Sequence, residues 1–406
     1  MLKERLGAAI TGIGLVTPAG IGTQANWKRV VEGKTTAAID PELDKFPVRI
    51  SCRVPEFTPE NLVANPWQWD RFAQFALVAT LEALRDANLE PRQWEDDARV
   101  AVIIGSGAGG TATMEAQHAA LLSEGPSGIS PLTLPMGLIN MATGQVAIEI
   151  GARGPCLAPC TACASGGSAI GIARDVLRAG LADIVIAGGA EAPITPLYVS
   201  SFARMRALSR REDPLLASRP FDANRDGFVL GEGAGIFVLE TEEHARRRNA
   251  RVHAKVLGYG TSADAHHVTS PHPEGRGAKI AMRMALADAG LNADQVGYIN
   301  AHGTSTPAND IIESAAIREV FGNRVAVSST KGVTGHLLGA GAAIEAAYAA
   351  LSLEHGVIPP TANLMNPDPR MDIDLVRQNA REQRLHFALS NSFGFGGQNV
   401  SLLFAA

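Results

Sequence analysis

Short apolar runs alternate with longer amphipathic stretches along this chain. Ala8–Val16 (A-A-I-T-G-I-G-L-V) predicts a buried strand, because the run is short and apolar and the turn sequence T-P-A-G follows it. Asp70–Asn88 predicts a helix, since its apolar residues recur at three- and four-residue steps. Arg99–Ile104 and Asp183–Ala187 predict two more buried strands. Strands that alternate with helices indicate an α/β fold whose sheets are mostly buried.

A similar order of elements repeats after a charged helix predicted at Glu240–Asn249, which we interpret as a hinge. The repetition suggests a duplicated unit, with one half in residues 1–250 and the other in residues 251–406. The remaining helices are predicted at 26–32, 111–123, 140–150, 168–179, 277–289, 309–320 and 341–355, with a loop at 126–135. The remaining strands are predicted within 221–240 and at 252–260, 297–301, 325–328, 385–389 and 400–404.

The composition narrows the functions that this chain can have. Its 406 residues are enough for two core-bearing halves, and a net charge of −5 with no long basic run gives a nucleic-acid partner no electrostatic support. No uninterrupted apolar run reaches about 18 residues, so we expect no membrane insertion. Met1–Gly7 is charged and shows no signal peptide, and four cysteines do not form the pattern of a secreted disulfide framework. We therefore expect a cytoplasmic protein.

Three of the four cysteines lie within eight residues, in G-P-C-L-A-P-C-T-A-C-A-S-G. Cys163 lies where a helix should begin, and a helix N-terminus favours the thiolate, so we expect a lowered thiol pKa and a nucleophile. Cys52 and Cys156 are expected to be small core residues. The spacing Cys160-x-x-Cys163 also suits a zinc site or a redox pair, although no second C-x-x-C occurs and a redox motif normally follows a short N-terminal βαβ unit.

Two histidines stand in unusual settings, in N-A-H-G-T-S-T-P and K-G-V-T-G-H-L-L-G-A-G. His302 and His336 each follow apolar or small residues and adjoin a glycine, so a ligand can approach them closely. They can stabilise an enolate or oxyanion, or they can be structural histidines bonded to backbone. The turn Gly394–Gly397 can form an oxyanion hole or simply link strands, and Gly105–Gly110 is a weak indicator of phosphate binding. These residues together predict a thiol-dependent α/β enzyme.

Several motifs then resemble one family in the order in which that family carries them. At T-A-C-A-S-G, N-A-H-G-T-S-T-P, S-S-T-K-G-V-T-G-H-L-L-G-A-G and N-S-F-G-F-G-G, the chain closely resembles the β-ketoacyl-acyl carrier protein synthases, over essentially its whole length. The elongating type II enzymes are the most similar members, and the group includes type II polyketide ketosynthases. The resemblance implies a thiolase-like fold, in which two similar βα halves stack in α-β-α-β-α layers, usually as a dimer.

The resemblance also implies a role for each matching residue. Cys163 is implied to be the acylated nucleophile, with the backbone N–H groups of Cys163 and Phe395 as the oxyanion hole. His302 and His336 are implied to promote decarboxylation of a malonyl unit and to stabilise the enolate. The implied supporting residues are Lys331, which orders His336, with Glu345 as its partner; Thr304 and Thr306, which bind the pantetheine amides; Phe393 and Phe395 of the gating loop; and Phe202 and Ala108 of the acyl pocket. A structural monovalent cation is implied near Asn300, Ala301, Glu345 and Asn391.

The implied reaction is a decarboxylative Claisen condensation of malonyl-carrier with an acyl chain on Cys163 in fatty acid elongation. The alternatives are the ketosynthase subunit of a type II polyketide synthase and a non-catalytic synthase partner. The intact Cys163 excludes the glutamine of decarboxylating partners, and His336 differs from the asparagine of initiating synthases. We expect no cofactor beyond the phosphopantetheine of the acyl carrier protein, and either a homodimer or a heterodimer with a chain-length factor.

Two departures from the family concern the carrier and the acyl chain. Trp67 and Trp69 occupy the segment before the 70–88 helix, where relatives often carry lysines and arginines that dock the acidic carrier. The expected docking residues are therefore a remaining basic cluster, which can otherwise be a solvated face: Arg204, Arg206, Arg210 and Arg211. Ala108 replaces a bulkier aliphatic residue of many relatives, which suggests a roomier acyl pocket for longer or unsaturated chains.

Overall fold

A computed structural model describes residues 7–58 and 64–406, so the charged segment Met1–Gly7 lies outside it except for Gly7. The first half contains β1 (Ala8–Thr17), β2 (Gly20–Ile21), α1 (Thr23–Val31), β3 (Ala38–Ile39), β4 (Ile50–Ser51), α2 (Arg71–Asp86), β5 (Val100–Gly105), α3 (Thr111–Glu124), α4 (Thr133–Gly137), α5 (Met141–Ile150), β6 (Cys156–Leu157), α6 (Ser165–Arg178), β7 (Ile184–Glu191), α7 (Pro196–Arg204), β8 (Gly233–Thr241) and α8 (Glu242–Arg247). The second half contains β9 (Ala254–Ala263), α9 (Arg276–Ala289), β10 (Tyr298–Asn300), α10 (Pro307–Phe321), β11 (Ala326–Ser328), α11 (Lys331–Thr334), α12 (Gly341–His355), β12 (Val357–Ile358), β13 (Asp374–Leu375), β14 (Arg381–Glu382), β15 (Phe387–Gly394) and β16 (Gln398–Ala405).

The strand order is the same in both halves. The first half is ordered β1-β8-β7-β5-β6 and the second β9-β16-β15-β10-β11, so in each the first strand lies beside the last. The two sets join where β1 pairs antiparallel with β9, at Ala8–Ile10 and Ala254–Val256. The predicted duplicated unit is therefore confirmed by topology. The division at residue 250 falls between α8 and β9, and as a domain boundary it stays a prediction.

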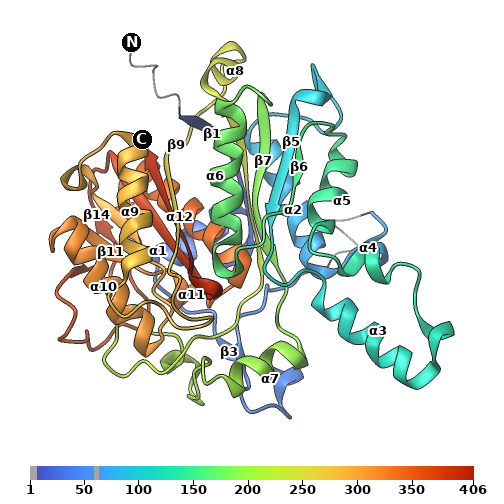
Figure 1. The fold of residues 1–406 in the computed structure, drawn as a ribbon, viewed down its shortest axis with the longest axis horizontal. Helices are drawn as coiled ribbons and strands as arrows, with labels where there is room; N and C mark the ends of the chain where they lie inside the picture. The colour runs from blue at the N-terminus through green and yellow to red at the C-terminus, as the bar shows by residue number, and fades with distance from the viewer. Residues whose placement is uncertain (1–6, 59–63) are drawn as a thin grey trace.

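Alternating residues on the strands build three cores between five layers. In β5, Ile103 faces the central core with α6 and α12, whereas Ile104 faces an outer core with α2 and α5. In the second half, Tyr298 joins the same central core and Ile299 joins an outer core with α9 and α10. Both faces of each sheet are thus apolar, as near-continuous hydrophobic strands require when helices cover both sides. The result is the expected α-β-α-β-α stack (Figure 1).

The close packing of α6 against α12 places the functional residues, and it explains one error of prediction. We predicted that this helix begins at Ser168, but α6 begins at Ser165 and includes two glycines. A Cβ on Gly166 would lie 2.9 Å from the Ala343 Cβ and the Gly339 carbonyl, and one on Gly167 would lie 3.4 Å from the Ala342 Cβ. Glycine costs helix propensity, yet here it permits an approach that no other residue allows.

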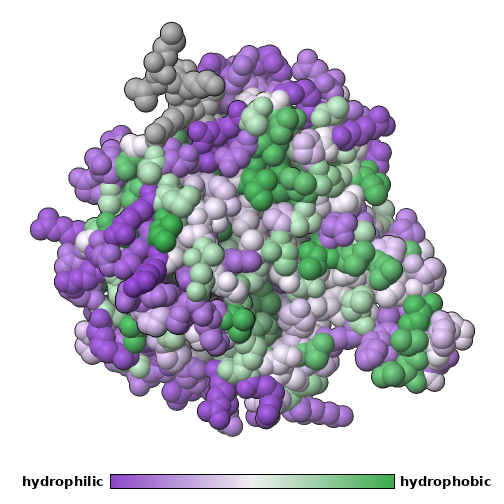
Figure 2. Space-filling view, viewed as in Figure 1, coloured by the Kyte–Doolittle hydropathy of each residue, from purple (hydrophilic) through white to green (hydrophobic). Residues whose placement is uncertain are grey.

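The segment predicted as a loop at 126–135 is partly helical. It opens with a 3-10 turn at Pro126–Gly128 and then enters α4, where Pro135 lies in the first turn. A proline is tolerated there because the first N–H groups of a helix have no partner within it. The neighbouring α3 projects from the body of the molecule (Figure 1), and its tip exposes Leu121 and Leu122 as an apolar knob (Figure 2).

Candidate active site

Cys163 lies in a sharp turn between the central sheet and α6. The residues Ala162–Ala164 form a 3-10 turn, which Ser165 continues directly as α6. Ala162 has φ +49°, a left-handed conformation that costs energy for a residue other than glycine. The Ser165 hydroxyl holds the turn, because it donates to the Ala162 carbonyl at 2.7 Å and accepts the Thr161 N–H at 2.9 Å. The predicted position at the start of a helix is therefore found.

His336 lies directly beside this thiol. Its Nε2 is 3.2 Å from the Cys163 Sγ, and the imidazole is buried. Two backbone bonds fix the residue, since its N–H donates to the Val229 carbonyl at 2.7 Å and its carbonyl accepts the Gly231 N–H at 3.0 Å. The ring stands edge-on to Phe228, with 5.1 Å between ring centroids. The geometry suits proton exchange between the thiol and the imidazole.

His302 completes a group of three at the end of β10. Its ring centroid lies 5.4 Å from that of His336 at 84° between the ring planes. A buried carboxylate shapes its turn, because Glu313 accepts the N–H of His302 at 2.8 Å and that of Gly303 at 2.7 Å. Gly303 has φ +37°, and a Cβ there would lie 2.5 Å from the Ser329 Cβ. Only glycine therefore fits beside this histidine.

Lys331 contacts His302 rather than His336, which corrects the role that the resemblance implied. The ammonium group donates to the His302 carbonyl at 2.6 Å and lies 3.4 Å from its Nδ1. It also forms a buried ion pair with Glu345, as expected. An ammonium can only donate, so Nδ1 of His302 accepts and the ring proton lies on Nε2.

The glycine-rich turn near the C-terminus lies against the cysteine backbone. A Cβ on Gly394 would lie 3.2 Å from the Cys163 backbone nitrogen, and the Phe395 N–H donates to the thiol sulfur. One of the two N–H groups named for an oxyanion hole, that of Phe395, therefore lies at the sulfur, and Gly394 packs against the backbone nitrogen of the other, Cys163.

One cavity of about 320 Å³ brings together half of the predicted residues. Its walls include Cys163, His302, His336, Phe202, Phe393, Phe395, Thr304, Thr306 and Arg206. The predicted residues that do not line it are Ala108, Lys331, Glu345, Arg204, Arg210, Arg211, Asn300, Ala301 and Asn391. Lys331 pairs with Glu345 and donates to the His302 carbonyl from outside the cavity. Ala108 donates its backbone N–H to Glu191 at 3.0 Å.

Comparisons with known proteins match this chain over nearly its whole length. The family described as "Beta-ketoacyl synthase, N-terminal domain" matches residues 8–245, and "Beta-ketoacyl synthase, C-terminal domain" matches residues 253–365. The chain belongs to the β-ketoacyl synthase family.

Individual relatives agree with that assignment. The 3-oxoacyl-(acyl-carrier-protein) synthase 2 of Synechocystis sp. is 45% identical over 409 residues, which cover 99% of this chain and 98% of that protein. The solved ishigamide ketosynthase/chain length factor superposes with a TM-score of 0.93 at 33% identity, with 99% of both chains covered. The type II PKS acyl-carrier protein in complex with its ketosynthase, AntDE:AntF, gives a TM-score of 0.91 at 34% identity, again with 99% of both chains covered.

Burial sets the protonation state of the thiol in this β-ketoacyl synthase. We expected the helix N-terminus to lower the pKa of Cys163, but burial raises it to about 11, against the opposing effects of Lys331 and the Phe395 N–H. The expectation was wrong because loss of solvent outweighs these favourable groups. The resting thiol is therefore neutral, and its activation requires a proton acceptor such as His336.

The two histidines are neutral at pH 7. Burial first, and then the Lys331 charge, hold the pKa of His302 and the pKa of His336 well below the ordinary value. The proton of His302 is fixed on Nε2 by Lys331. Within the described residues Nδ1 of His336 has no hydrogen-bond partner, so that ring can carry its proton on either nitrogen.

Two buried glutamates at the site were missed by sequence reasoning. Glu313 shapes the His302 turn, and Glu191 accepts four bonds, from the Ser106 hydroxyl and the N–H groups of Gly107, Ala108 and Gly339. No spacing rule links a helix carboxylate to a turn eleven residues earlier, although a lone glutamate that ends an apolar strand (D-I-V-I-A-G-G-A-E) is a signal for Glu191. Glu191 also explains part of the Gly105–Gly110 turn, where the N–H groups of Gly107 and Ala108 donate to this carboxylate.

The other cysteine interpretations fare differently. All four cysteines are free thiols, with Cys160 exposed and Cys163 buried, so no disulfide joins these two in the structure. In the residues that the structure describes, no group of three or more histidine, cysteine, aspartate or glutamate side chains can hold a metal ion, which argues against zinc. Cys52 is buried as expected, but Cys156 is exposed on the edge strand β6, where no second strand covers it in the described part of the chain.

The basic cluster reaches the cavity through Arg206, whereas Arg210 and Arg211 line a second pocket beside Arg49. Arg204 ends α7, Arg206 lines the cavity, and Arg210 and Arg211 follow, all four with exposed side chains. Trp67 is 65% exposed, whereas Trp69 packs partly against the core. Every helix among the described residues is too short or too polar to cross a membrane.

Proposed function

We propose that this chain is a β-ketoacyl-acyl carrier protein synthase that elongates fatty acids by decarboxylative Claisen condensation. The observation that carries the proposal is the 3.2 Å contact between the Cys163 Sγ and the His336 Nε2, with His302 in the same cavity. This reaction needs a nucleophile, a proton acceptor and an N–H donor for the enolate oxygen, and Cys163, His336 and His302 can supply them in that order. The full-length relative named 3-oxoacyl-(acyl-carrier-protein) synthase 2 supports the same reaction.

In the first half-reaction, Cys163 takes the acyl chain from its carrier. The thiol proton passes to His336, and the sulfur forms a bond to the acyl carbonyl carbon. The carbonyl oxygen becomes negative and accepts the N–H groups of Cys163 and Phe395. The carbon–sulfur bond to the carrier then breaks, and the departing thiolate takes the proton from His336. Acyl-Cys163 and a free carrier thiol result.

In the second half-reaction, malonyl-carrier supplies the carbon nucleophile. The bond to its carboxylate breaks, carbon dioxide leaves, and the electron pair forms an enolate whose oxygen accepts N–H groups from His302 and His336. The enolate carbon attacks the acyl carbonyl and displaces the Cys163 thiolate, which regains a proton from solvent. The product is 3-oxoacyl-carrier. Neutral histidines suit this step, because a neutral imidazole still carries one N–H group that can donate a hydrogen bond to the enolate oxygen.

The prosthetic arm of the carrier fits the same cavity. We infer that Thr304 and Thr306, whose hydroxyls lie 2.8 Å apart on the cavity wall, bind the pantetheine amides. Phe393 and Phe395 gate the opening with Phe202, whose ring centroid is 6.2 Å from that of Phe395. Arg204, Arg206 and Arg210 dock the acidic carrier, and attraction between opposite charges speeds such an encounter. Ala108 stays proposed as an acyl-pocket residue, on the Glu191 side of the thiol.

A structural monovalent cation fits behind the histidines. Within the described residues, four buried polar atoms there have no hydrogen-bond partner: the Asn300 Oδ1 and Nδ2, the Glu345 Oε2 and the Ser390 Oγ. Asn300 and Ser390 are paired neighbours on β10 and β15, and oxygen donors of this kind suit an alkali cation. The sequence-based set also named Ala301 and Asn391, and the Asn391 Oδ1 accepts the Ser401 hydroxyl at 2.7 Å. A bound cation would hold Glu345, and through it Lys331, in place.

We infer that the enzyme works as a dimer of two copies in the cytoplasm. The open edge of β6 can template a further strand, and Leu157 on it, Ile148 on α5 and Leu122 on α3 are exposed apolar side chains. Four free thiols suit a reducing compartment. The alternative is the ketosynthase of a polyketide pathway paired with a chain-length factor, which the ishigamide ketosynthase/chain length factor favours.

Mass spectrometry of the carrier-bound products tests the proposal. The purified chain, incubated with acyl-carrier and malonyl-carrier, is expected to give an acylated Cys163 peptide and a 3-oxoacyl-carrier one malonyl-derived unit longer. Cys163→Ala should give neither. Absence of both with the unaltered chain would refute the enzyme, whereas product only after addition of a ketosynthase-like partner subunit would favour the polyketide alternative.

A further inference from the structure

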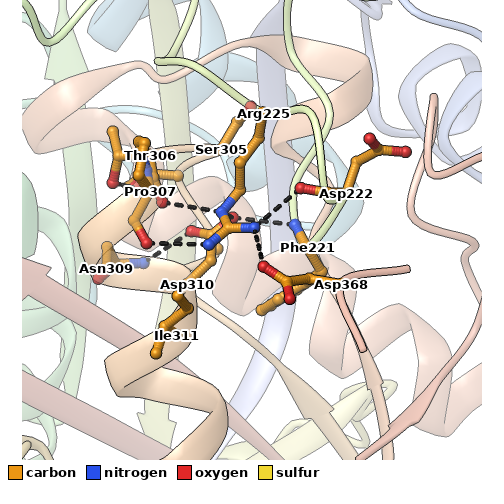
Figure 3. A network of polar contacts seen from close by, with 12 residues as sticks. Phe221, Asp222, Arg225, Ser305, Thr306, Pro307, Asn309, Asp310, Ile311 and Asp368 are labelled. Atoms are coloured by element: carbon orange, nitrogen blue, oxygen red, sulfur yellow. Dashed lines mark hydrogen bonds and ion pairs between the residues drawn. The ribbon is translucent and has the colours of Figure 1, made fainter. Parts of the chain in front are cut away.

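The turn that carries His302 is gripped by a single buried arginine from the other half of the chain. Arg225 lies between α7 and β8, and its side chain is 2% exposed. Its Nε donates to the Thr306 carbonyl at 3.1 Å, and its Nη2 donates to the Pro307 carbonyl at 2.9 Å. Figure 3 shows the guanidinium between these carbonyls and a group of aspartates.

The opposite side of the guanidinium is held as firmly. Its Nη1 donates to the Asp222 carbonyl at 2.8 Å and to the Asp368 carboxylate at 2.9 Å. The Asp310 carboxylate lies 3.5 Å from Nε and accepts the Phe221 N–H at 2.9 Å. The Asp222 carboxylate in turn accepts the N–H groups of residues 365 and 366 at 3.0 and 2.8 Å. These contacts fix the position of the guanidinium, so it cannot shift together with the His302–Pro307 turn.

Residues near Arg225 in the chain also bond Ser305, the residue of this turn with a strained backbone conformation. Ser305 has φ +68°, which a residue other than glycine adopts only when its surroundings hold it. The Ser305 carbonyl accepts the Gly227 N–H at 3.0 Å, and its hydroxyl accepts the Arg219 N–H at 2.9 Å. The turn from His302 to Pro307 is thus fixed by contacts from outside and not by its own preference.

We propose that Arg225 is a positioning residue, whose guanidinium sets the His302–Pro307 turn so that His302, Thr304 and Thr306 meet the carrier-borne malonyl unit. This inference rests on the proposed function. The planar fork with five donors bonds three carbonyls and one carboxylate at once, which is more acceptors than the three N–H groups of a lysine can serve. The hydrogen bonds of the guanidinium go to Thr306, Pro307, Asp222 and Asp368, so we expect its loss to act on decarboxylation more than on the reactivity of the thiol.

Two rates measured on one variant test the assignment. Arg225→Lys is expected to lower kcat/KM for malonyl-carrier decarboxylation about tenfold, because small displacements of positioned groups cost this much or more. Alkylation of Cys163 by iodoacetamide should stay within about twofold, since it needs only the thiol and His336. Arg174→Lys is the matched control, because Arg174 is 3% exposed, pairs with Asp175 and Asp288, and lies outside the cavity. It should leave both rates unchanged.

The outcomes separate this inference from the proposed function. Decarboxylation by Arg225→Lys equal to that of the unaltered enzyme, or alkylation that falls in parallel, overturns the positioning role. No decarboxylation by the unaltered enzyme overturns the proposed function instead. Should Arg225→Lys fail to fold, Asp368→Asn loosens one anchor of the guanidinium and is expected to slow decarboxylation about threefold with alkylation unchanged. An unchanged decarboxylation rate in that variant also overturns the role.

Discussion

Two regions of this molecule bury histidines, and the two regions give them opposite charges. His302 and His336 at the active site are 3% and 2% exposed, and both have a pKa well below the ordinary value. His253, which precedes β9, is 8% exposed. Although burial lowers it, hydrogen bonds to Asp86 and Glu354 raise the pKa of His253 to about 9. Burial lowers the pKa of the histidines in both regions, so burial alone does not explain their different charges.

The charged groups next to each histidine account for the difference in charge. His253 has a carboxylate at each nitrogen, with Nε2 2.8 Å from Asp86 and Nδ1 2.8 Å from Glu354, and only an imidazolium can donate to both. It thereby clamps the end of α2 to the end of α12. The active-site pair faces the Lys331 ammonium instead, whose charge opposes a second positive charge. One region uses histidine as a fixed cation and the other as a neutral hydrogen-bond donor.

Removal of the lysine should have the largest effect on this contrast. In Lys331→Met the cation that lowers the pKa of His302 is lost, so that pKa rises, and Glu345 is left buried without its partner. Decarboxylation of malonyl-carrier at pH 7 is expected to fall about a hundredfold. The acidic limb of its pH–rate profile should move to higher pH, because His302 becomes protonated at a higher pH than before.

A second lysine provides the control for that experiment. Lys279→Met removes a lysine that pairs with Glu319 near the surface, and it should leave the pH–rate profile in place. An acidic limb that does not move in Lys331→Met would show that burial alone keeps His302 neutral.

Substitution of the clamp should change stability in a pH-dependent way. Because the folded pKa of His253 is about 9 and the unfolded value is near 6.5, its charge stabilises the fold fully below about pH 6.5, and the effect is lost as the pH rises through 9. His253→Gln is expected to lower the free energy of unfolding by about 3 kcal/mol at pH 6 and by much less at pH 10. Urea denaturation at both pH values measures the difference.

The exposed His386 offers the matched control for the clamp. His386→Gln should leave stability unchanged at both pH values. If His253→Gln costs the same free energy at pH 6 and at pH 10, then the loss comes from packing, and the charged clamp is the wrong description.

The smallest expected effect concerns the aromatic contact that orients His336. Among the described residues no carboxylate bonds this ring, and its edge-on neighbours are Phe228 and His302. Phe228→Leu keeps an apolar side chain but removes the ring, and alkylation of Cys163 is expected to slow about threefold. Iodoacetamide kinetics checks this, and a rate equal to that of the unaltered enzyme would mean that the two backbone bonds of His336 suffice.

The sequence predicted the chain-local features well. Apolar periodicity located most strands and helices, and the motifs around Cys163, His302 and His336 named residues that the structure brings into one cavity. The α6 start was misplaced because glycine propensity is a local quantity, whereas the contact of Gly166 with α12 is not. The direction of the Cys163 pKa was wrong for a similar reason, since the extent of burial depends on the whole fold. Likewise, nothing local links Arg225 to a turn eighty residues later.

The protonation states of the histidines can be measured directly by a nitrogen-15 NMR titration of the histidine-labelled protein, with His302, His336 and His253 assigned by substitution. His302 and His336 are expected to stay neutral below the ordinary histidine pKa of about 6.5, with the His302 proton on Nε2. His253 is expected to stay doubly protonated until the pH approaches 9. An imidazolium signal from His302 or His336 at neutral pH would contradict the claim that Lys331 and burial keep the catalytic pair uncharged.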